Sequence, residues 1–217
     1  MQFQDRADAG RQLANALQRY SSENPIVVAL PRGGVPVALE VARGLHADLD
    51  VMAARKIGAP WQPELGIGAV APDGVQVLDS ATIESLGIEQ HRIDRIAAAE
   101  IAEMDRRTAR YRGGRPVLRV TGRTAILVDD GLATGVTARA AIASLRKQNP
   151  ARLVLAVPVC AAETAQSIAS EVDDLVCLMA PEQFQAVGLW YRDFAQLTDD
   201  DVVRMLSTAR TKESDSS

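Results

Sequence analysis

The stretch that most constrains the fold is residues 124–137, which read Thr-Ala-Ile-Leu-Val-Asp-Asp-Gly-Leu-Ala-Thr-Gly-Val-Thr. Residues 125–128 form a short, unbroken apolar run, which is typical of a strand buried on both faces. From Val136 onward apolar residues recur at helical spacing, and Asn149-Pro150 ends that pattern. The segment therefore predicts a buried strand, a tight loop and a helix in direct succession.

The loop between this strand and this helix predicts an anion site. The first backbone N–H groups of a helix lack partners within the helix, and the helix dipole favours a phosphate there. Gly135 permits a close approach of the backbone to a ligand, and Thr134 and Thr137 add hydroxyl donors. The adjacent carboxylates Asp129 and Asp130 instead suit sugar hydroxyls or a hydrated cation. Ribose 5-phosphate has a phosphate and a diol at opposite ends, as this loop requires.

The segment resembles the binding loop of type I phosphoribosyltransferases, in which apolar residues and two acids precede three variable residues and Thr-Gly-x-Thr. The resemblance implies that Asp129 and Asp130 face the ribose 2′- and 3′-hydroxyls of phosphoribosyl pyrophosphate (PRPP). An ordinary turn between a strand and a helix of an α/β protein is the alternative. The resemblance also implies that the 5′-phosphate is bound by Ala133, Thr134, Gly135, Val136 and Thr137.

A second strand–loop–helix unit lies nearer the N-terminus. The apolar run 26–30 leads into Pro31-Arg32-Gly33-Gly34, and a helix is expected over 35–43. Exposed amides of two glycines beside an arginine suit a second anion, although a plain glycine turn is the alternative. The resemblance implies that Arg32, Gly33 and Gly34 bind pyrophosphate.

A third apolar run, 49–54, is expected to be a strand that ends at Arg55-Lys56. Lysine occurs at only two other positions, Lys147 in a helix end and Lys212 in a polar tail, where solvation explains it. Lys56 instead follows a strand, at the edge where α/β proteins bind ligands. The resemblance implies that Lys56 and Arg55 contact the pyrophosphate, and a solvated pair at the strand end is the alternative for Arg55.

The order of elements predicts an α/β fold. Strands over 153–159 and 175–179 flank a helix over 162–170, and alternating strands and helices indicate a Rossmann-like parallel sheet flanked by helices. The resemblance implies a type I phosphoribosyltransferase fold with a small hood. We expect one domain over 1–210 and a disordered polar tail over 211–217.

A long helical insertion separates the third strand from residues 124–137. We expect a loop over 58–65, a hairpin of 66–71 and 75–78, and a charged helix over 88–112. Glu64 in the loop is expected to be a surface acid, and an acid near the reacting centre is the alternative. The charged helix is either an outer helix or the lid that closes over the site in the resembled family, with Gly113-Gly114 as its hinge. Hood and lid together would cover about 57–115 and 181–197.

Residues 181–194 hold four of the eight aromatic residues other than histidine, among them Phe184, Trp190 and Tyr191. The hood of the resembled family holds the nucleobase, so Trp190 or Tyr191 would stack on a flat acceptor. Packing in the core or in a dimer interface is the alternative. Thr198 is expected to cap a final helix with three acids in its first turn.

The composition excludes several classes of protein. A net charge of −4 and a pI near 5.3 give no broad attraction to nucleic acid. There is no apolar run long enough for a membrane span, and residues 1–20 do not resemble a signal peptide. Cys160 and Cys177 lie beside apolar runs, so we expect buried free thiols. We expect a cytoplasmic protein, and the resemblance implies a homodimer.

The resemblance implies a Mg²⁺-dependent transfer of ribose 5-phosphate from PRPP to a nitrogenous base or another amine, with release of pyrophosphate. The expected catalytic residues are Arg32, Lys56, Asp129 and Asp130. Mg²⁺ would be held through the pyrophosphate and the ribose hydroxyls, with the two acids as candidate ligands. Many 6-oxopurine enzymes carry an acid where this chain has Ala133, so hypoxanthine and guanine are disfavoured, and residues 132–135 look more like the adenine enzymes.

Two other functions are alternatives to the enzyme. A regulator of the same fold would bind PRPP or a nucleotide without turnover, but it need not keep the leaving-group residues Arg32 and Lys56. A receiver-type phosphoacceptor using Asp129 or Asp130 would need a lysine at a later strand end. The strands over 153–159 and 175–179 offer none. The sequence does not identify the acceptor of the phosphoribosyl group.

Overall fold

The main sheet of the computed structural model, which describes residues 2–117 and 119–211, is parallel throughout. Its strand order is β2-β1-β6-β7-β8, and Ala29 of β1 lies opposite Val128 of β6. The loops after these two central strands therefore leave the sheet at the same place. The predicted α/β class is confirmed. The bounds are β1 (Ile26–Ala29), β2 (Asp48–Val51), β6 (Thr124–Val128), β7 (Arg152–Val159) and β8 (Asp174–Met179).

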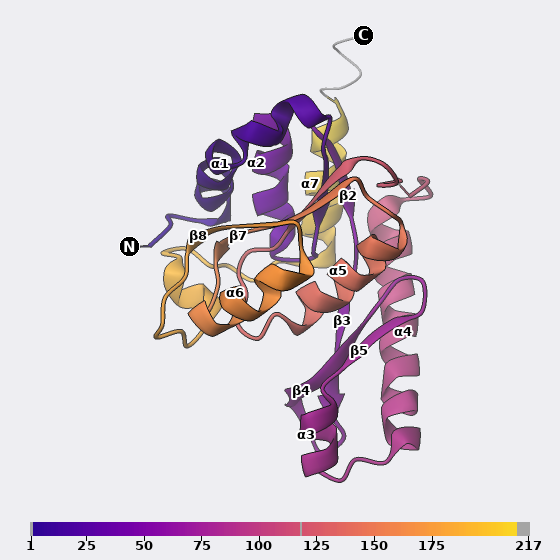
Figure 1. The fold of residues 1–217 in the computed structure, drawn as a ribbon. Coiled ribbons are helices and arrows are strands. Elements are labelled where there is room, and N and C mark those ends of the chain that lie inside the picture. The colour runs from indigo at the N-terminus through magenta and orange to yellow at the C-terminus, as the bar shows by residue number, and fades with distance from the viewer. Residues whose placement is uncertain (1, 118, 212–217) are drawn as a thin grey trace.

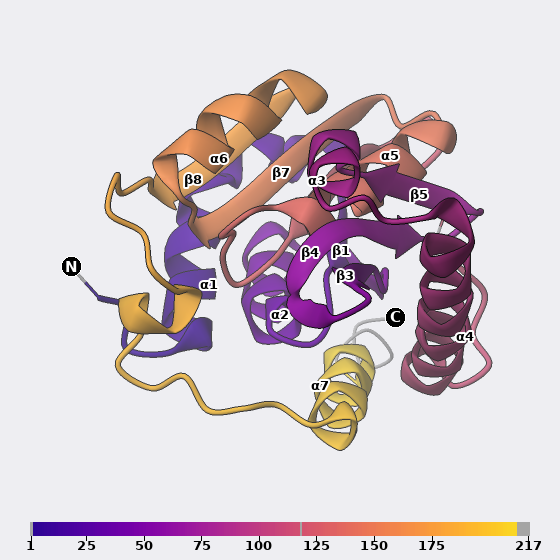
Figure 2. The ribbon, with the colours of Figure 1, turned by 90° about the horizontal axis from the view of Figure 1, so that it is seen from below.

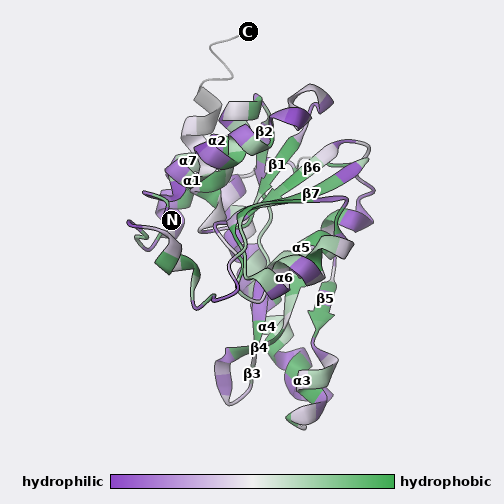
Figure 3. Ribbon diagram, turned by 60° about the vertical axis from the view of Figure 1, so that its left-hand side comes forward, coloured by the Kyte–Doolittle hydropathy of each residue, from purple (hydrophilic) through white to green (hydrophobic). Residues whose placement is uncertain are grey.

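Helices cover both faces of this sheet (Figure 1). Alternate strand residues point to opposite faces, so Val27 and Ile126 pack on one side, and Val28 and Leu127 on the other. The strands β1, β6 and β7 are hydrophobic nearly throughout (Figure 3), as two-sided burial requires. The first face carries α1 (Arg6–Ala16), α2 (Gly34–Leu45) and α7 (Asp199–Thr211), and the second carries α5 (Val136–Lys147) and α6 (Ala162–Ile168). Short 3₁₀ turns are η1 (Gln18–Glu23), η2 (Ala169–Glu171) and η3 (Val187–Trp190).

A small lobe, residues 55–112, projects from the main sheet (Figure 1). Its antiparallel sheet has the order β3-β4-β5, and one face packs on α4 through Ile57, Ile67 and Ile93. The expected hairpin is confirmed because β4 pairs with β5. The elements are β3 (Arg55–Ala59), β4 (Gln62–Ala71), β5 (Val75–Leu78), α3 (Ser80–Ser85) and α4 (Gln90–Arg112).

Two predictions near this lobe, one of a loop and one of a strand, were wrong. The expected loop over 58–65 is mostly strand, because the turn is confined to Pro60-Trp61 and β4 begins directly after it. A register shift beside Gly58 accommodates Pro63 within β4. The strand expected over 49–54 ends at Val51, and Arg55-Lys56 begin β3 instead of ending β2. The physical reason is the same in both cases. Sheet pairing with distant residues, which the local pattern does not contain, decides where these strands begin and end.

The long charged helix was predicted correctly as α4, with Ile93, Ala97, Met104 and Tyr111 buried along one stripe. Gly113 and Gly114 follow it with positive φ values of 57° and 82°, which favour glycine at a helix end. Figure 2 shows α4 and α7 along the same edge of the molecule. Movement of α4 as a lid stays a prediction.

The ends of the chain match the sequence expectations where they are described. Thr198 Oγ1 accepts the Asp201 N–H at 3.2 Å, and the Thr198 N–H donates to Asp201 Oδ2 at 2.8 Å, so the predicted cap is present. Thr211 ends α7, and the rest of the expected tail lies outside the described residues.

Cys160 is buried, Cys177 is half-buried, and both are free. Among the described helices, none has the length and apolar character needed to cross a membrane.

Candidate functional site

The loops that follow β1 and β6 lie against each other at the carboxyl edge of the sheet. A side chain at Gly33 would overlap the carboxylate of Asp130, and a Cβ at Gly34 would lie 2.7 Å from the Val128 carbonyl oxygen. Both positions therefore require glycine because of this close approach. The peptide between Pro31 and Arg32 in the same loop is cis. The structure thus brings the predicted pyrophosphate loop and the predicted ribose loop into one site.

The acid pair of this site is largely removed from solvent. Asp129 Oδ1 accepts the backbone N–H of Asp130 at 2.8 Å. Burial, together with the neighbouring Asp130 charge, raises the pKa of Asp129 well above its ordinary value. Burial also raises the pKa of Asp130, although Arg6 acts in the opposite direction. The pair is therefore an unfavourable place for two charges unless a ligand or a cation compensates them.

Arg6 is a site residue that the sequence reasoning missed. Its Nε lies 2.7 Å from Asp130 Oδ2, and the two side chains are only 12% and 13% exposed. Its Nη1 donates to the Ala195 carbonyl at 2.9 Å, and its guanidinium lies 3.7 Å from the centre of the Phe194 ring. An arginine in an N-terminal helix carries no local pattern that marks this contact. A cleft of about 370 Å³ is lined here by Arg6, Arg32, Gly33, Asp130, Phe194, Gln196 and Leu197.

The predicted phosphate loop surrounds the start of α5. Gly135 has a φ of 69°, and a Cβ there would lie 2.9 Å from Thr164 Cγ2. Thr164 Oγ1 donates to the Ala133 carbonyl at 2.5 Å, so α6 supports the loop from behind. Ala133 and Thr134 are exposed, whereas Val136 and Thr137 begin the helix. This is the strand, loop and helix N-terminus that an anion site requires.

Lys56 and Arg55 lie in a different cleft from Arg32. Lys56 Nζ lies 3.1 Å from the Glu64 carbonyl and 3.7 Å from its carboxylate, which is 96% exposed, as expected of a surface acid. Arg55 pairs with Glu100 of α4 at 2.6 Å. Both line a cleft of about 540 Å³ that also contains Thr137 of the phosphate loop. Lys56 thus shares a cleft with Thr137 of the predicted phosphate loop, and its role toward pyrophosphate stays a prediction.

The two predicted acceptor-binding aromatics differ in their surroundings. Tyr191 is 4% exposed, its hydroxyl donates to the Asp130 carbonyl at 2.5 Å, and burial raises its pKa. Its ring lies 5.4 Å from Phe3 and 5.1 Å from Phe194, which fits the packing alternative. Trp190 is half-buried and stacks on Phe184 with ring centres 6.3 Å apart. Acceptor binding by either ring stays a prediction.

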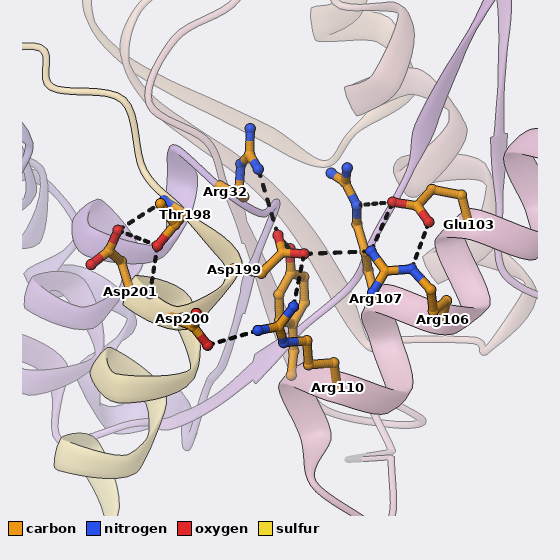
Figure 4. A network of polar contacts seen from close by, with 10 residues as sticks. Arg32, Glu103, Arg106, Arg107, Arg110, Thr198, Asp199, Asp200 and Asp201 are labelled. Carbon is orange, nitrogen blue, oxygen red and sulfur yellow. Dashed lines mark hydrogen bonds and ion pairs between the residues drawn. The ribbon is translucent and has the colours of Figure 1, made fainter.

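Arg32 also faces a second cleft, of about 440 Å³, toward α7 (Figure 4). Its Nη1 lies 3.6 Å from Asp199 Oδ1. Arg106 and Arg110 of α4 approach the other oxygen of the same carboxylate at 3.5 Å and 3.7 Å. From the sequence, the helix that carries Arg106 and Arg110 was expected to be either an outer helix or a lid, and these contacts were not predicted. The spacing of 106, 107 and 110 on one helix was the available signal.

Few side chains among the described residues are placed to coordinate Mg²⁺. Among the described residues there is no group of three or more histidine, cysteine or acidic side chains that could hold a metal ion. Asp129 and Asp130 are instead two adjacent acids beside a phosphate-type loop. Mg²⁺ in phosphate sites commonly takes one or two carboxylates and completes its shell with substrate oxygens and water. The residues therefore fit a Mg²⁺ ion that arrives with its phosphorylated substrate.

A family model described as "Phosphoribosyl transferase domain" matches residues 2–191, so the chain belongs to the phosphoribosyl transferase family. The description of this family names a transferase of phosphoribosyl groups.

Individual relatives agree with this assignment. Two curated Mycobacterium tuberculosis proteins that carry a provisional phosphoribosyl transferase name are 45% identical over 207 residues, which is 95% of this chain. The chain spans about half the length of these relatives, 47%. The crystal structure of TT1426 from Thermus thermophilus is 42% identical, with a TM-score of 0.80 over 95% of this chain and 98% of that one. A Neisseria gonorrhoeae protein crystallised with bound ppGpp is 13% identical over 97% of this chain and 99% of that one, with a TM-score of 0.53, and shows the fold alone.

Proposed function

We propose that the chain transfers ribose 5-phosphate from PRPP to a nitrogenous base or another amine acceptor, with Mg²⁺ and with release of pyrophosphate. The observation that carries the proposal is the direct contact between Gly33 and Asp130. A loop suited to pyrophosphate and a loop suited to ribose 5-phosphate then lie at one sheet edge, as a ligand carrying both groups requires. We also propose that it acts in the cytoplasm in nucleotide salvage, as a homodimer, on the strength of the family resemblance.

The charges of the reaction match the residues of the site. Breaking the bond between ribose C1 and the pyrophosphate leaves positive charge on the sugar and a highly charged leaving group. Asp129 and Asp130 would orient the ribose hydroxyls and offset the cationic sugar, while Arg32, Lys56 and the Gly33-Gly34 amides would stabilise the pyrophosphate. The pyrophosphate and the ribose hydroxyls would hold Mg²⁺, with Asp129 and Asp130 as candidate ligands, and the ion would supply charge neutralisation at the leaving group.

A second candidate is a regulator that binds PRPP or a nucleotide without turnover. The observation that favours it is that all three predicted pyrophosphate cations contact carboxylates of the chain itself. Arg32 pairs with Asp199, Lys56 with Glu64, and Arg55 with Glu100. Cations paired in this way do not require that the chain turn PRPP over.

The deciding experiment measures pyrophosphate release from PRPP and Mg²⁺ with adenine, guanine, hypoxanthine, xanthine, uracil or orotate as acceptor. Calorimetry measures PRPP binding in parallel. Release with one base supports the transferase and identifies the acceptor. Binding without release for any acceptor supports the regulator, and failure of both measurements overturns the assignment of the ribose loop.

A further inference from the structure

Asp199 lies among cationic side chains from two separate parts of the chain (Figure 4). Arg32 approaches one carboxylate oxygen at 3.6 Å, while Arg106 and Arg110 approach the other at 3.5 and 3.7 Å. The Tyr111 hydroxyl donates a much shorter hydrogen bond of 2.6 Å. We call Arg32, Arg106 and Arg110 the arginine cluster. Its three guanidinium groups surround a single carboxylate without closing to hydrogen-bonding distance.

These distances are long for arginine–carboxylate pairs. Charge-assisted hydrogen bonds are usually about 2.7–2.9 Å long, and the cluster forms such bonds elsewhere, since Arg110 lies 2.7 Å from Asp200 and Arg106 lies 2.7 Å from Glu103. Asp199 has only two oxygens to offer three guanidinium groups, and Arg106 and Arg110 form their short contacts with Glu103 and Asp200 instead. A phosphate offers more acceptor oxygens, and the planar fork of arginine matches them.

The surroundings of the Asp199 side chain favour a negative charge at its position. The Asp199 side chain is 12% exposed. Burial acts to raise its pKa, yet the Tyr111 hydroxyl together with Arg107 and Arg32 lowers the pKa overall. A cleft of about 440 Å³ lies beside it, lined by Arg32, Arg110 and residues 196–200. There is thus space for a larger anion next to the carboxylate.

We propose that the arginine cluster is a binding site for a diphosphate or polyphosphate group, and that Asp199 occupies it as an internal competitor. The proposal rests on the proposed function in so far as Arg32 belongs to the pyrophosphate loop. The proposed site also contains Arg106 and Arg110 of the small lobe. An incoming anion would have to displace the carboxylate of Asp199, in the first turn of α7, from these arginines. The cleft at Asp130 and the cleft at Asp199 share Arg32, Gln196 and Leu197, so the two sites are contiguous.

A purely structural network that anchors α7 to α4 is the opposing explanation. The two explanations differ in the sign of one effect. If Asp199 competes with a bound anion, removing its charge strengthens anion binding. If Asp199 merely holds the arginines in position, removing its charge weakens anion binding or leaves it unchanged.

The experiment titrates the full chain with inorganic pyrophosphate by calorimetry at fixed ionic strength. Asp199→Asn is expected to bind pyrophosphate about 3- to 10-fold more tightly than the wild type, because an internal anion no longer competes. Tyr111→Phe removes the hydrogen bond that retains Asp199, and a smaller gain in the same direction is expected. The double variant R106Q/R110Q is expected to bind about tenfold more weakly.

Two exposed residues of α4 provide matched controls. Asp105→Asn makes the same change in net charge as Asp199→Asn, and Arg95→Gln makes the same kind of change as the arginine variants. Neither should alter pyrophosphate affinity by more than about twofold, because both lie outside the cluster.

Pyrophosphate affinity in D199N and Y111F that is equal to or weaker than wild type would overturn the proposal, as would unchanged affinity in R106Q/R110Q. Thermal unfolding of each variant shows whether it folds, and Y111F keeps the test decisive if D199N does not. PRPP turnover is not part of this readout. A failure of the transferase proposal is therefore distinguishable from a failure of this one.

Discussion

Asp130 is held at the site by groups from three distant parts of the chain. Arg6 donates to its carboxylate at 2.7 Å, and Tyr191 donates to its carbonyl at 2.5 Å. Gly33 leaves the space that its side chain fills. Burial meanwhile raises the pKa of both Asp129 and Asp130. A buried acid pair supported in this way suits hydroxyl binding better than fold stability.

Replacement of both acids by amides, D129N/D130N, should abolish PRPP use, weaken PRPP binding strongly and leave the fold intact. Hydrogen bonds to a charged group contribute about 1.5–3 kcal/mol each, so affinity should fall by about 100-fold or more. Calorimetry with PRPP measures the loss, and a cooperative thermal transition reports the fold. Wild-type affinity in this variant would remove the ribose assignment.

The thiols should be unreactive in the folded chain. Burial raises the pKa of Cys160 to about 12 and also raises the pKa of Cys177. The thiolate is the reactive form, so a thiol reagent at pH 8 should react much faster after unfolding than before. Since the raised pKa favours the neutral thiol in the folded state, this contribution to stability is complete below the ordinary pKa near 9. It is lost as pH rises toward 12. Rapid reaction of both thiols in the native protein would contradict the prediction.

At the scale of the elements, two strand–loop–helix units form the site because their strands are neighbours. The β1 and β6 pairing sets the loops side by side, and two glycines allow them to touch. The small lobe adds a third contribution, since Lys56 on β3 reaches the cleft that contains Thr137. The candidate site therefore lies between elements, and no single element contains it.

Gly33→Ala should weaken PRPP binding and destabilise the chain, because the added methyl group overlaps the Asp130 carboxylate. Overpacking of this kind costs about 1–3 kcal/mol. Gly74→Ala is a matched control, since Gly74 has a φ of 66° but open space around its Cβ position. It should cost about 1 kcal/mol through backbone strain alone and leave PRPP binding unchanged. Equal effects of the two variants on PRPP binding would argue against contact between the loops at the site.

Lys56→Ala should slow turnover more than it weakens the binding of ribose 5-phosphate. Removing one preorganised donor to developing charge costs about 10²–10³ in kcat, whereas ribose 5-phosphate carries no leaving group for Lys56 to contact. Steady-state kinetics and calorimetry separate the two effects. Exposed Lys147 provides the control K147A, and equal losses of turnover and binding in K56A would indicate a structural lysine.

At the scale of the whole molecule, the chain combines a parallel sheet, covered by helices, with an antiparallel lobe attached at the carboxyl edge of that sheet (Figure 1). Helices α4 and α7 connect the lobe to the main body through Tyr111 and Asp199. This connection passes directly beside Arg32. An anion bound as proposed at the arginine cluster would therefore contact both parts of the molecule.

The proposed homodimer belongs to this scale. Sedimentation equilibrium should give about twice the chain mass of 23.3 kDa at micromolar concentration, as the family resemblance implies. The same measurement with PRPP and Mg²⁺ shows whether ligand changes the assembly. A mass equal to one chain at every concentration tested would contradict the prediction.

The sequence by itself determined the elements whose signals are local. Residues 124–137 contain the strand, the acid pair, the glycine turn and the helix start within one short segment, and all appear as predicted. The stripe of α4 and the cap at Thr198 are also written in neighbouring residues. The parallel sheet followed from the alternation of such units.

Tertiary structure alone decided the contacts between distant segments. Arg6 reaches Asp130 across 124 positions, and Asp199 meets Arg32 only because α7 returns to the first loop. Lys56 was expected at the end of a main-sheet strand but lies in β3, because pairing with β4 set that strand's limits. Local sequence encodes propensity and periodicity, whereas these contacts depend on how far-separated surfaces pack. That packing is a property of the whole chain.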